Sequence, residues 1–223
     1  MDFALLEDFS RVRDYSPERF VNELLKEKAN VKAAVCGFNF RFGKMGLGDS
    51  DTLRELMGDG GCIIVPPVYR DGRLVSSTAI RLFIIAGEMD KAADMLGRPF
   101  FIDFPVVHGK QLGRTIGIPT INQNFPEGHI IPKSGIYACT VDIGGDIFLG
   151  VSNVGTRPTI KNDRHVINCE THIINYNGWL YGKDIKVSFH KRLRDEMKFP
   201  DIDSLKAQIG RDIVSTKEYF SDK

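Results

Sequence analysis

The sequence has 223 residues, of which 42% are apolar, enough to fill the core of one large domain or of two domains of ordinary size. Its 30 basic and 29 acidic residues give a formal charge of +1, which excludes the strong positive excess of proteins that bind a phosphate backbone or an anionic membrane surface. No apolar run approaches the roughly 20 residues that a membrane-spanning helix requires.

The cysteines and the first residues indicate a reduced setting. The four cysteines are far apart and form no CxxC pair: Cys36, Cys62, Cys139 and Cys169. The opening segment "MDFALLEDFS" lacks the basic and apolar regions of a signal peptide. We therefore expect a cytoplasmic protein with no membrane partner.

Residues 1–100 alternate short apolar runs with helical patterns. "SPERFVNELLKEK" predicts a helix with Ser16 as its N-cap and Pro17 in its first turn. "VKAAVCGF" and "CIIVPPV" predict buried strands, and "FALL" a third. "VSSTAIRLF" and "EMDKAADMLG" predict two more helices, the second closed by Gly97. This order indicates an α/β domain, and one with fewer strands than a doubly wound nucleotide-binding domain usually has.

Residues 101–223 change to period-2 alternation, which is typical of antiparallel strands. The strands expected are "GIYACTVDI" and "DIFLGV" around a Gly-Gly-Asp turn, then "HVINCETHII" and "DIKVSFHKR" with an Asn-Gly turn signal between them. Four or more such strands predict a small closed barrel. After Pro200, Asp203 is the expected cap of a helix whose Leu205, Ile209 and Ile213 face the barrel.

The segment "GRTIGIPTIN", residues 113–122, is a candidate phosphate site. Gly113 and Gly117 allow the backbone to approach a ligand, and Arg114 adds a positive fork. Thr120 and Asn122 lie two positions apart, so on a strand both face one side, and their neutral oxygens can ligate Mg²⁺. The alternatives are an ordinary turn into the barrel and an ordinary polar strand start.

A second candidate is "NCETHI". Along this strand Asn168, Glu170 and His172 share the polar face. Glu170 then faces solvent or a cleft, where a carboxylate can act as a base, and His172 can relay a proton. Both also occur as ordinary surface side chains.

The order of "GRTIGIPTIN", "IIPKSGIYA", "SNVGTRPTI", "ETHI", "LYG" and "LRDEMKF" resembles the riboflavin kinase module of the bacterial bifunctional riboflavin kinase/FAD synthetases, over residues 104–220. The resemblance implies a six-stranded antiparallel barrel with a C-terminal helix. It also implies an enzyme that uses Mg²⁺ to transfer the γ-phosphate of ATP to the 5′-hydroxyl of riboflavin, giving FMN and ADP.

The resemblance also implies roles for single residues. It assigns Pro119, Thr120 and Asn122 to the magnesium nucleotide and Glu170 to the general base. The other residues expected at the nucleotide are Gly113, Arg114, Gly117, Asn153 and Arg157, with Gly155 and Thr159 in the same second loop. Arg194 and Phe199 are expected at the flavin, with a charge at the start of the helix and a core aromatic residue as alternatives.

The first half is similar to the FMN adenylyltransferase domain of the same family, through "GFNFRFG" and "GRLVSSTAIR". The phosphate-binding residues that this similarity implies are Ser76, Ser77, Thr78 and Arg81. The catalytic HxGH of that domain has no counterpart, since His108 and His129 begin nothing similar. We therefore expect an incomplete Rossmann-like nucleotidyltransferase domain over residues 1–100, a kinase domain over residues 101–223 and no FAD synthesis.

Several alternatives stay open. The missing first third of the adenylyltransferase domain can be natural, a wrong gene boundary or the result of cloning, and its unpaired strand edge can favour self-association. A truncated bifunctional protein can also act as a non-catalytic flavin-binding or regulatory protein. A small barrel can instead bind single-stranded nucleic acid in the manner of OB-folds. The near-neutral charge and Glu170 disfavour that class, so small-molecule substrates are expected and nucleic acid is not.

Overall fold

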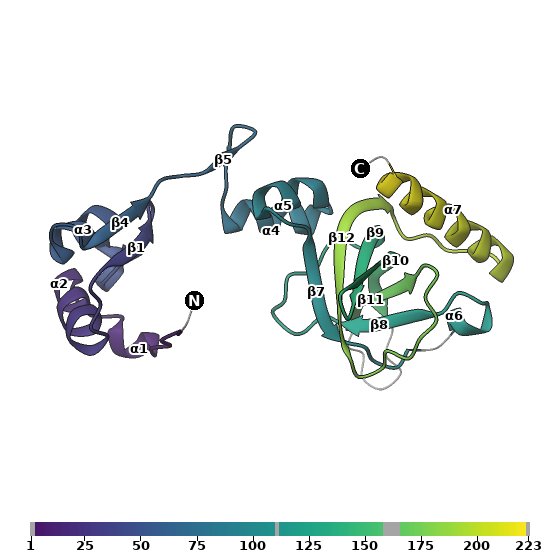
Figure 1. Ribbon diagram of the computed structural model, residues 1–223, viewed down its shortest axis with the longest axis horizontal. Coiled ribbons are helices and arrows are strands. Elements are labelled where there is room, and N and C mark those ends of the chain that lie inside the picture. Colours follow the sequence, from purple (N-terminus) through teal and green to yellow (C-terminus); the bar gives the residue numbers. More distant parts are fainter. Residues whose placement is uncertain (1–2, 110–111, 158–165, 222–223) are drawn as a thin grey trace. The chain divides into compact units, whose positions relative to one another are not determined.

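The computed structural model describes residues 3–109, 112–157 and 166–221. The chain divides into two compact units, Met1–Leu74 and Val75–Lys223. Figure 1 labels the elements of both units. We describe them in turn, as the N-terminal unit and the C-terminal unit.

The N-terminal unit is a small α/β fold built on two parallel strands. Its main elements are α1 (Phe9–Val12), α2 (Pro17–Arg19) continuing as a π-type helix Phe20–Lys28, β1 (Ala34–Gly37), α3 (Ser50–Met57) and β4 (Cys62–Val65). Two short hairpins complete it: β2 (Arg41–Phe42) with β3 (Gly48–Asp49), around a 3₁₀ turn at Lys44–Gly46, and β5 (Tyr69–Arg70) with β6 (Arg73–Leu74). Ser16 caps α2 as expected, since its hydroxyl accepts the Arg19 N–H at 3.2 Å.

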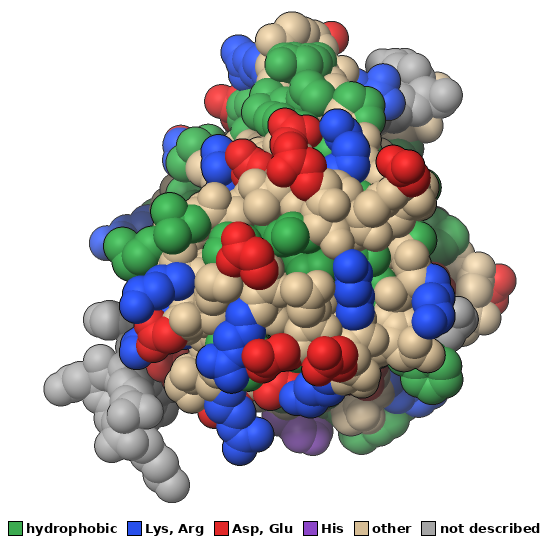
Figure 2. All heavy atoms as spheres, turned by 90° about the vertical axis from the view of Figure 1, so that its left-hand side faces the viewer, with side chains coloured by type: hydrophobic (Ala, Val, Ile, Leu, Met, Phe, Trp, Pro, Cys, Tyr) green, Lys and Arg blue, Asp and Glu red, His purple; other side chains and the backbone are tan. Residues whose placement is uncertain are grey.

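The two parallel strands are covered on one face only. The covered face joins a core around Val21, Phe42 and Leu53. On the other face Val35 and Ile63, which are opposite each other in the ladder, are 67% and 60% exposed. The prediction of buried strands was therefore wrong for this face. The prediction of a third strand at "FALL" was wrong as well, because residues 3–8 form no helix or strand. Figure 2 shows apolar side chains reaching the surface between charged ones.

The C-terminal unit is a six-stranded antiparallel sheet with three helices of eight or more residues. Its elements are α4 (Ser77–Ala86), α5 (Met89–Leu96), β7 (Phe100–Pro105), α6 (Leu112–Thr115), β8 (Thr120–Asn124), β9 (Gly135–Ile143), β10 (Asp146–Arg157), β11 (Val166–Ile173), β12 (Asp184–Arg194) and α7 (Ile202–Ser221). The strand order is β7-β12-β9-β10-β11-β8. The predicted class, an α/β part followed by a six-stranded antiparallel barrel with a C-terminal helix, is confirmed.

The edge strands β7 and β8 come together where the sheet curls. The Val107 N–H donates to the Asn122 carbonyl at 2.8 Å. Gln123 is fully buried, and its Nε2 donates to the carbonyls of Phe104 and Ile185 at 2.6 and 2.7 Å. These bonds tie β8 to the opposite side of the barrel and satisfy backbone groups that a free edge would expose.

The barrel interior is apolar and holds two thiols. Tyr137, Val141 and Phe189 are fully buried there together with Cys139 and Cys169. Burial raises the pKa of Cys169 to about 11 and raises that of Cys139 further, because loss of water disfavours a thiolate more than contacts with the Ser152 and Thr171 hydroxyls favour it. Both thiols therefore stay protonated and unreactive at neutral pH.

Two local expectations were wrong. β11 and β12 are not neighbours in the sheet, so Asn177-Gly178 does not form a hairpin turn between them. The positive φ angles of that connection fall at Asn175 and Gly182. The cap of α7 is Asp201 rather than Asp203, since the Asp201 carboxylate accepts the Ser204 N–H at 2.7 Å.

The last helix covers one outer face of the barrel. α7 contacts β9 and β10, and its Ile213 packs on a cluster with Ile136 and Val151. The predicted packing of this helix on the barrel is therefore confirmed. Within the described part of the chain, no helix combines the length and the apolar character needed to cross a bilayer.

Candidate active site

A row of side chains runs across the outer face of the sheet beneath α7. In the strand ladders Asn122 of β8 is opposite Glu170 of β11, Glu170 is opposite Asn153 of β10, and Asn153 is opposite Ile136 of β9. Ile136 is in turn opposite Arg194, at the end of β12. Residues directly opposite in an antiparallel ladder share a face and lie about 5 Å apart. Five strands thus contribute one residue each to a continuous row.

A second row lies one pleat further along. Thr120 is opposite His172, which is opposite Val151. The His172 Nδ1 lies 2.9 Å from the Pro119 carbonyl. Because a carbonyl only accepts, Nδ1 carries the hydrogen, and in a neutral ring Nε2 is then left as an acceptor.

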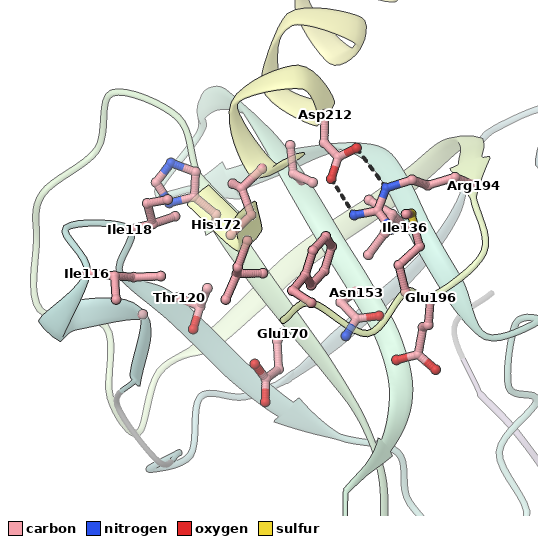
Figure 3. Close-up of a pocket in the computed structure, with 16 residues that line it drawn as sticks. Ile116, Ile118, Thr120, Ile136, Asn153, Glu170, His172, Arg194, Glu196 and Asp212 are labelled. Atoms are coloured by element: carbon pink, nitrogen blue, oxygen red, sulfur yellow. Dashed lines mark hydrogen bonds and ion pairs between the residues drawn. The ribbon is translucent and has the colours of Figure 1, made fainter. Parts of the chain in front are cut away.

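The helix and the segment that precedes it close these rows into a pocket of about 270 Å³. Its walls are largely apolar. The residues that line it are Gly113, Ile116, Ile118, Thr120, Ile136, Val151, Asn153, Glu170, His172, Arg194, Glu196, Met197, Phe199, Leu205, Ile209 and Asp212. Figure 3 shows Asp212 and Arg194 at one end and Glu170 and Glu196 at the other. A mainly apolar cavity with a few convergent polar groups is the usual form of a small-molecule site.

A paired charge holds α7 against the sheet. The Arg194 Nε and Nη2 donate to the two carboxylate oxygens of Asp212 at 2.9 and 2.7 Å. The Gln208 Nε2 also donates to Asp212, at 2.9 Å. The side chains of Arg194 and Asp212 are 18% and 5% exposed. Two parallel N–H···O bonds fix the position of Arg194, which lines the pocket.

The polar end is organised by an amide. The Asn168 Nδ2 donates both to the Asn122 Oδ1 and to the Glu170 Oε1, at 3.2 Å each. Asn122 and Asn168 are buried, whereas Glu170 is half-buried and lines the pocket. The Asn153 Oδ1 is also buried, without a hydrogen-bond partner among the described residues. A buried acceptor without a donor is a feature that a bound ligand can satisfy.

The pocket brings together some of the residues that the sequence singled out, and Gly117, Pro119 and Asn122 are not among those that line it. Gly113, Thr120, Asn153 and Glu170 line it together with the two residues expected at the flavin, Arg194 and Phe199. Pro119 and Asn122 lie next to these residues: the Pro119 carbonyl contacts His172, and the Asn122 Oδ1 accepts a bond from Asn168. The side chains of Arg114 and Arg157, and Thr159 as a whole, lie outside the described part of the chain.

The two glycines of the 113–122 loop are needed for different structural reasons. A Cβ on Gly113 would lie 2.3 Å from the Ile118 carbonyl oxygen, so the backbone folds onto itself there and leaves no room for a side chain. The Ile118 N–H donates to the Gly113 carbonyl at 2.8 Å, which closes this turn. Gly117 instead has a φ of +79°, which other residues rarely adopt. The glycines therefore shape the loop that carries Thr120.

Sequence reasoning gave no role to three polar residues in or beside the pocket: Asn168 behind it, and Glu196 and Asp212 in its lining. Asn168 lies on the polar face already recognised, and its place two residues before Glu170 was a usable signal. Glu196 lies within "LRDEMKF", and its carboxylate lies against Gly155, where a Cβ would be 2.2 Å from the Glu196 Oε1. Asp212 gave no local signal, because its partner Arg194 is 18 residues away in the sequence.

The residues expected to hold phosphate in the first half lie at the start of α4. Ser76 is the N-cap, with its hydroxyl accepting the Ala79 N–H at 3.2 Å. Ser77, Thr78 and Arg81 follow in the helix and are exposed. α4 and α5 belong to the C-terminal unit.

A second, smaller cavity of about 200 Å³ lies beside the first. Thr120 lines both. The second cavity is lined by Val106, Pro119, Thr120, Ile121, Ile173, Tyr176, Asn177, Gly178, Leu180 and Tyr181. His108 stacks on Tyr181, with ring centroids 4.0 Å apart. Flat aromatic and aliphatic walls of this kind suit a planar ring system.

Comparison with known proteins agrees with this geometry. Two family models match the chain, riboflavin kinase over residues 96–220 and FAD synthetase over residues 1–79. The "Bifunctional riboflavin kinase/FMN adenylyltransferase" of Bacillus subtilis is 36% identical over 209 residues, which are 93% of this chain and 66% of that protein. The protein of the same name from Escherichia coli is 36% identical over 224 residues, or 99% of this chain and 71% of that protein. The chain thus spans about two thirds of the length of these relatives.

A solved structure has a similar fold. It is titled "Crystal Structure of Macrolide-efflux Protein from Streptococcus pneumoniae" and matches with a TM-score of 0.81 and 31% sequence identity. The match covers 92% of this chain and 66% of that one. The family models and the similarity to full-length relatives agree with the order of motifs around the pocket. The chain therefore belongs to the family of the bifunctional riboflavin kinase/FMN adenylyltransferases, with its riboflavin kinase region at residues 96–220.

Proposed function

We propose that this chain is a riboflavin kinase, which transfers the γ-phosphate of ATP to the 5′-hydroxyl of riboflavin and releases FMN and ADP. The observation that carries the proposal is the position of Glu170. Its carboxylate is at the polar end of an apolar pocket, beside the neutral oxygens of Thr120 and Asn122. The apolar walls suit the flavin ring, and the polar end suits the hydroxylated chain that carries the reacting oxygen.

In this mechanism Glu170 is the general base. The 5′-oxygen of riboflavin forms a bond to the γ-phosphorus, while the bond from that phosphorus to the bridging oxygen of ADP breaks. The hydroxyl proton passes to the Glu170 carboxylate, and ADP leaves with the electron pair. Phosphoryl transfer requires mainly positioning and charge neutralisation from the protein, so a single carboxylate at the attacking oxygen suffices.

The donor set at Thr120 and Asn122 fits a magnesium ion. A hydroxyl and an amide carbonyl are hard oxygen ligands, and Mg²⁺ usually takes only one or two protein ligands together with substrate phosphates. The Asn122 Oδ1 accepts one bond from Asn168, which leaves its second lone pair for an ion. A bound Mg²⁺ would neutralise phosphate charge during transfer. Among the described residues, no group of three acidic, histidine or cysteine side chains offers a different metal site.

We infer that the nucleoside of ATP occupies the second cavity. Thr120 lines this cavity as well as the flavin pocket, so phosphates that extend from a nucleoside there toward Glu170 pass Thr120. Tyr176 and Tyr181 offer ring faces to the base. Asn153 and the 113–122 loop then lie along the phosphate path.

The direct test is conversion of riboflavin to FMN with ATP and Mg²⁺, followed by chromatography with fluorescence detection. Turnover supports the kinase. Tight flavin binding without turnover would favour the non-catalytic alternative instead. The nucleic-acid alternative has less support, because the formal charge of the chain is only +1. Figure 2 shows basic and acidic side chains interspersed on the one face that it draws.

We predict that replacing Thr120 and Asn122 together by alanine weakens binding of the magnesium nucleotide by about 10-fold or more, since each loss of about 1.4 kcal/mol is a factor of 10. Riboflavin affinity should change much less, because the apolar walls remain. Titration calorimetry of an ATP analogue with and without Mg²⁺ measures this. Asn124→Ala, an exposed position on the same strand, is the control. An unchanged magnesium dependence in the double variant would refute the assignment.

We also predict that these 223 residues form no FAD from FMN and ATP. Adenylyl transfer requires positive groups at the α-phosphate and the leaving pyrophosphate, which the family supplies with its HxGH histidines at a helix N-terminus. None of the five histidines lies in residues 1–100. The exposed Ser77, Thr78 and Arg81 can still hold a phosphate. Chromatography of the reaction mixture decides the question: FAD above a protein-free control contradicts the prediction.

We infer that kinase function belongs to residues 101–223 and the adenylyltransferase-like part to residues 1–100. The extents of the two family models, 96–220 and 1–79, support this division. Self-association through the first part remains a prediction. The exposed apolar face of β1 and β4 is the surface that would serve it.

A further inference from the structure

Asn168 is a buried polar residue on the pocket side of β11. It is 4% exposed and lies two positions before Glu170, so the two side chains share a face. Its neighbour across the ladder on β10 is Gly155, which has no side chain, and on β8 it is Asn124. Asn168 does not line the pocket itself. It lies behind the groups that do.

Its amide nitrogen connects two groups of the proposed reaction. One nitrogen donates to the Glu170 Oε1 and to the Asn122 Oδ1, both at 3.2 Å. An amide nitrogen has two hydrogens, so both bonds form at the same time. The general base on β11 and the carbonyl on β8 are thus held to a common point by a residue that does not line the pocket.

A half-buried carboxylate needs such a restraint. A glutamate has three rotatable side-chain bonds, and a base must lie within hydrogen-bond reach of the proton that it accepts. A displacement of about 1 Å at a reacting group can cost about 10²-fold in rate. Fixing Oε1 through Asn168 leaves the second carboxylate oxygen to face the pocket. Fixing the Asn122 carbonyl in the same way holds the direction of its free lone pair, which is left for an ion.

We propose that Asn168 is a positioning residue that sets the distance and orientation between the Glu170 carboxylate and the Asn122 carbonyl. This inference rests on the proposed kinase function. It adds a residue whose effect on the reaction passes through Glu170 and Asn122 rather than through substrate contact.

The test is Asn168→Leu, which keeps the branched arrangement of heavy atoms at Cγ and has no donor. Its kcat should fall about 10- to 100-fold, as expected for a misplaced base, while KM for riboflavin changes less than about threefold. Affinity for an ATP analogue in the presence of Mg²⁺, measured by calorimetry, should fall, and affinity without Mg²⁺ should not. A kcat within about twofold of the unchanged protein would overturn the proposal. No turnover by the unchanged protein would instead overturn the kinase proposal on which it rests.

A double-mutant cycle separates positioning from general damage. If Asn168 acts on kcat through Glu170, then Asn168→Leu in a Glu170→Gln background should lower kcat by less than about threefold, because coupled residues are not additive. A full 10- to 100-fold loss in that background would show that the effect is not transmitted through Glu170.

Two further variants guard against misfolding. Thr171→Val changes an equally buried polar residue on the opposite face of β11, where Thr171 bonds to Ser152 at 2.8 Å. It should lower stability and leave kcat unchanged, and a matching loss of kcat would mean that strand damage explains both. Asn168→Ser, which places no apolar group beside the carboxylate but is too short to reach both acceptors, should lower kcat as Asn168→Leu does. A folded Asn168→Ser protein with normal kcat would also reject the proposal.

Discussion

Replacing Glu170 by glutamine will keep the fold and lower kinase turnover by about 10²- to 10⁴-fold, the usual loss when a general base is removed. A glutamine carbonyl can still accept the bond from Asn168, so the local structure is retained. Its amide cannot take up the proton of the attacking hydroxyl. FMN formation under saturating riboflavin and ATP is the measurement.

The control for this variant is Glu127→Gln, an exposed position in the same unit. It removes one carboxylate that does not line the pocket and should keep full turnover. KM for riboflavin should change little in Glu170→Gln, since the apolar walls are intact. Turnover within a factor of about three of the unchanged protein would remove Glu170 from the role of base.

Replacing Asp212 by alanine will destabilise the C-terminal unit by about 2–4 kcal/mol, because breaking a buried ion pair leaves the other charge without its partner. The lower end of this range of free energy applies because Arg194 is partly exposed and still donates to the Asp195 carbonyl at 2.9 Å, so its charge keeps some compensation. α7 loses its polar attachment to β12, and the pocket wall from Leu205 and Ile209 loosens. Flavin binding should therefore weaken together with stability.

Urea unfolding followed by tryptophan fluorescence and by circular dichroism measures this effect. The single tryptophan, Trp179, lies in the C-terminal unit, so its signal reports on that unit. Glu218→Ala, at an exposed position on the same helix, should change the free energy of unfolding by less than about 0.5 kcal/mol. Equal stability of the Asp212→Ala and Glu218→Ala proteins would show that the Arg194–Asp212 pair does not hold the helix.

The sequence alone determined the class of fold and the faces of the strands. Side chains alternate along a strand with period 2 whatever its neighbours are, so "NCETHI" already separated Glu170 and His172 from the buried Cys169 and Thr171. The same local rule placed Thr120 and Asn122 on one side of their strand. Helix signals at Ser16, Pro17 and Gly97 are local as well, and the structure confirms them.

Only the tertiary structure decided which strands are neighbours and in what register. That choice depends on contacts between residues far apart in the chain, which no local pattern contains. It placed β8 beside β11, and so gave Glu170 and Asn122 a common donor in Asn168. It also joined Arg194 to Asp212 and left one face of β1 and β4 uncovered, because burial depends on what packs against a strand as well as on its own apolar residues.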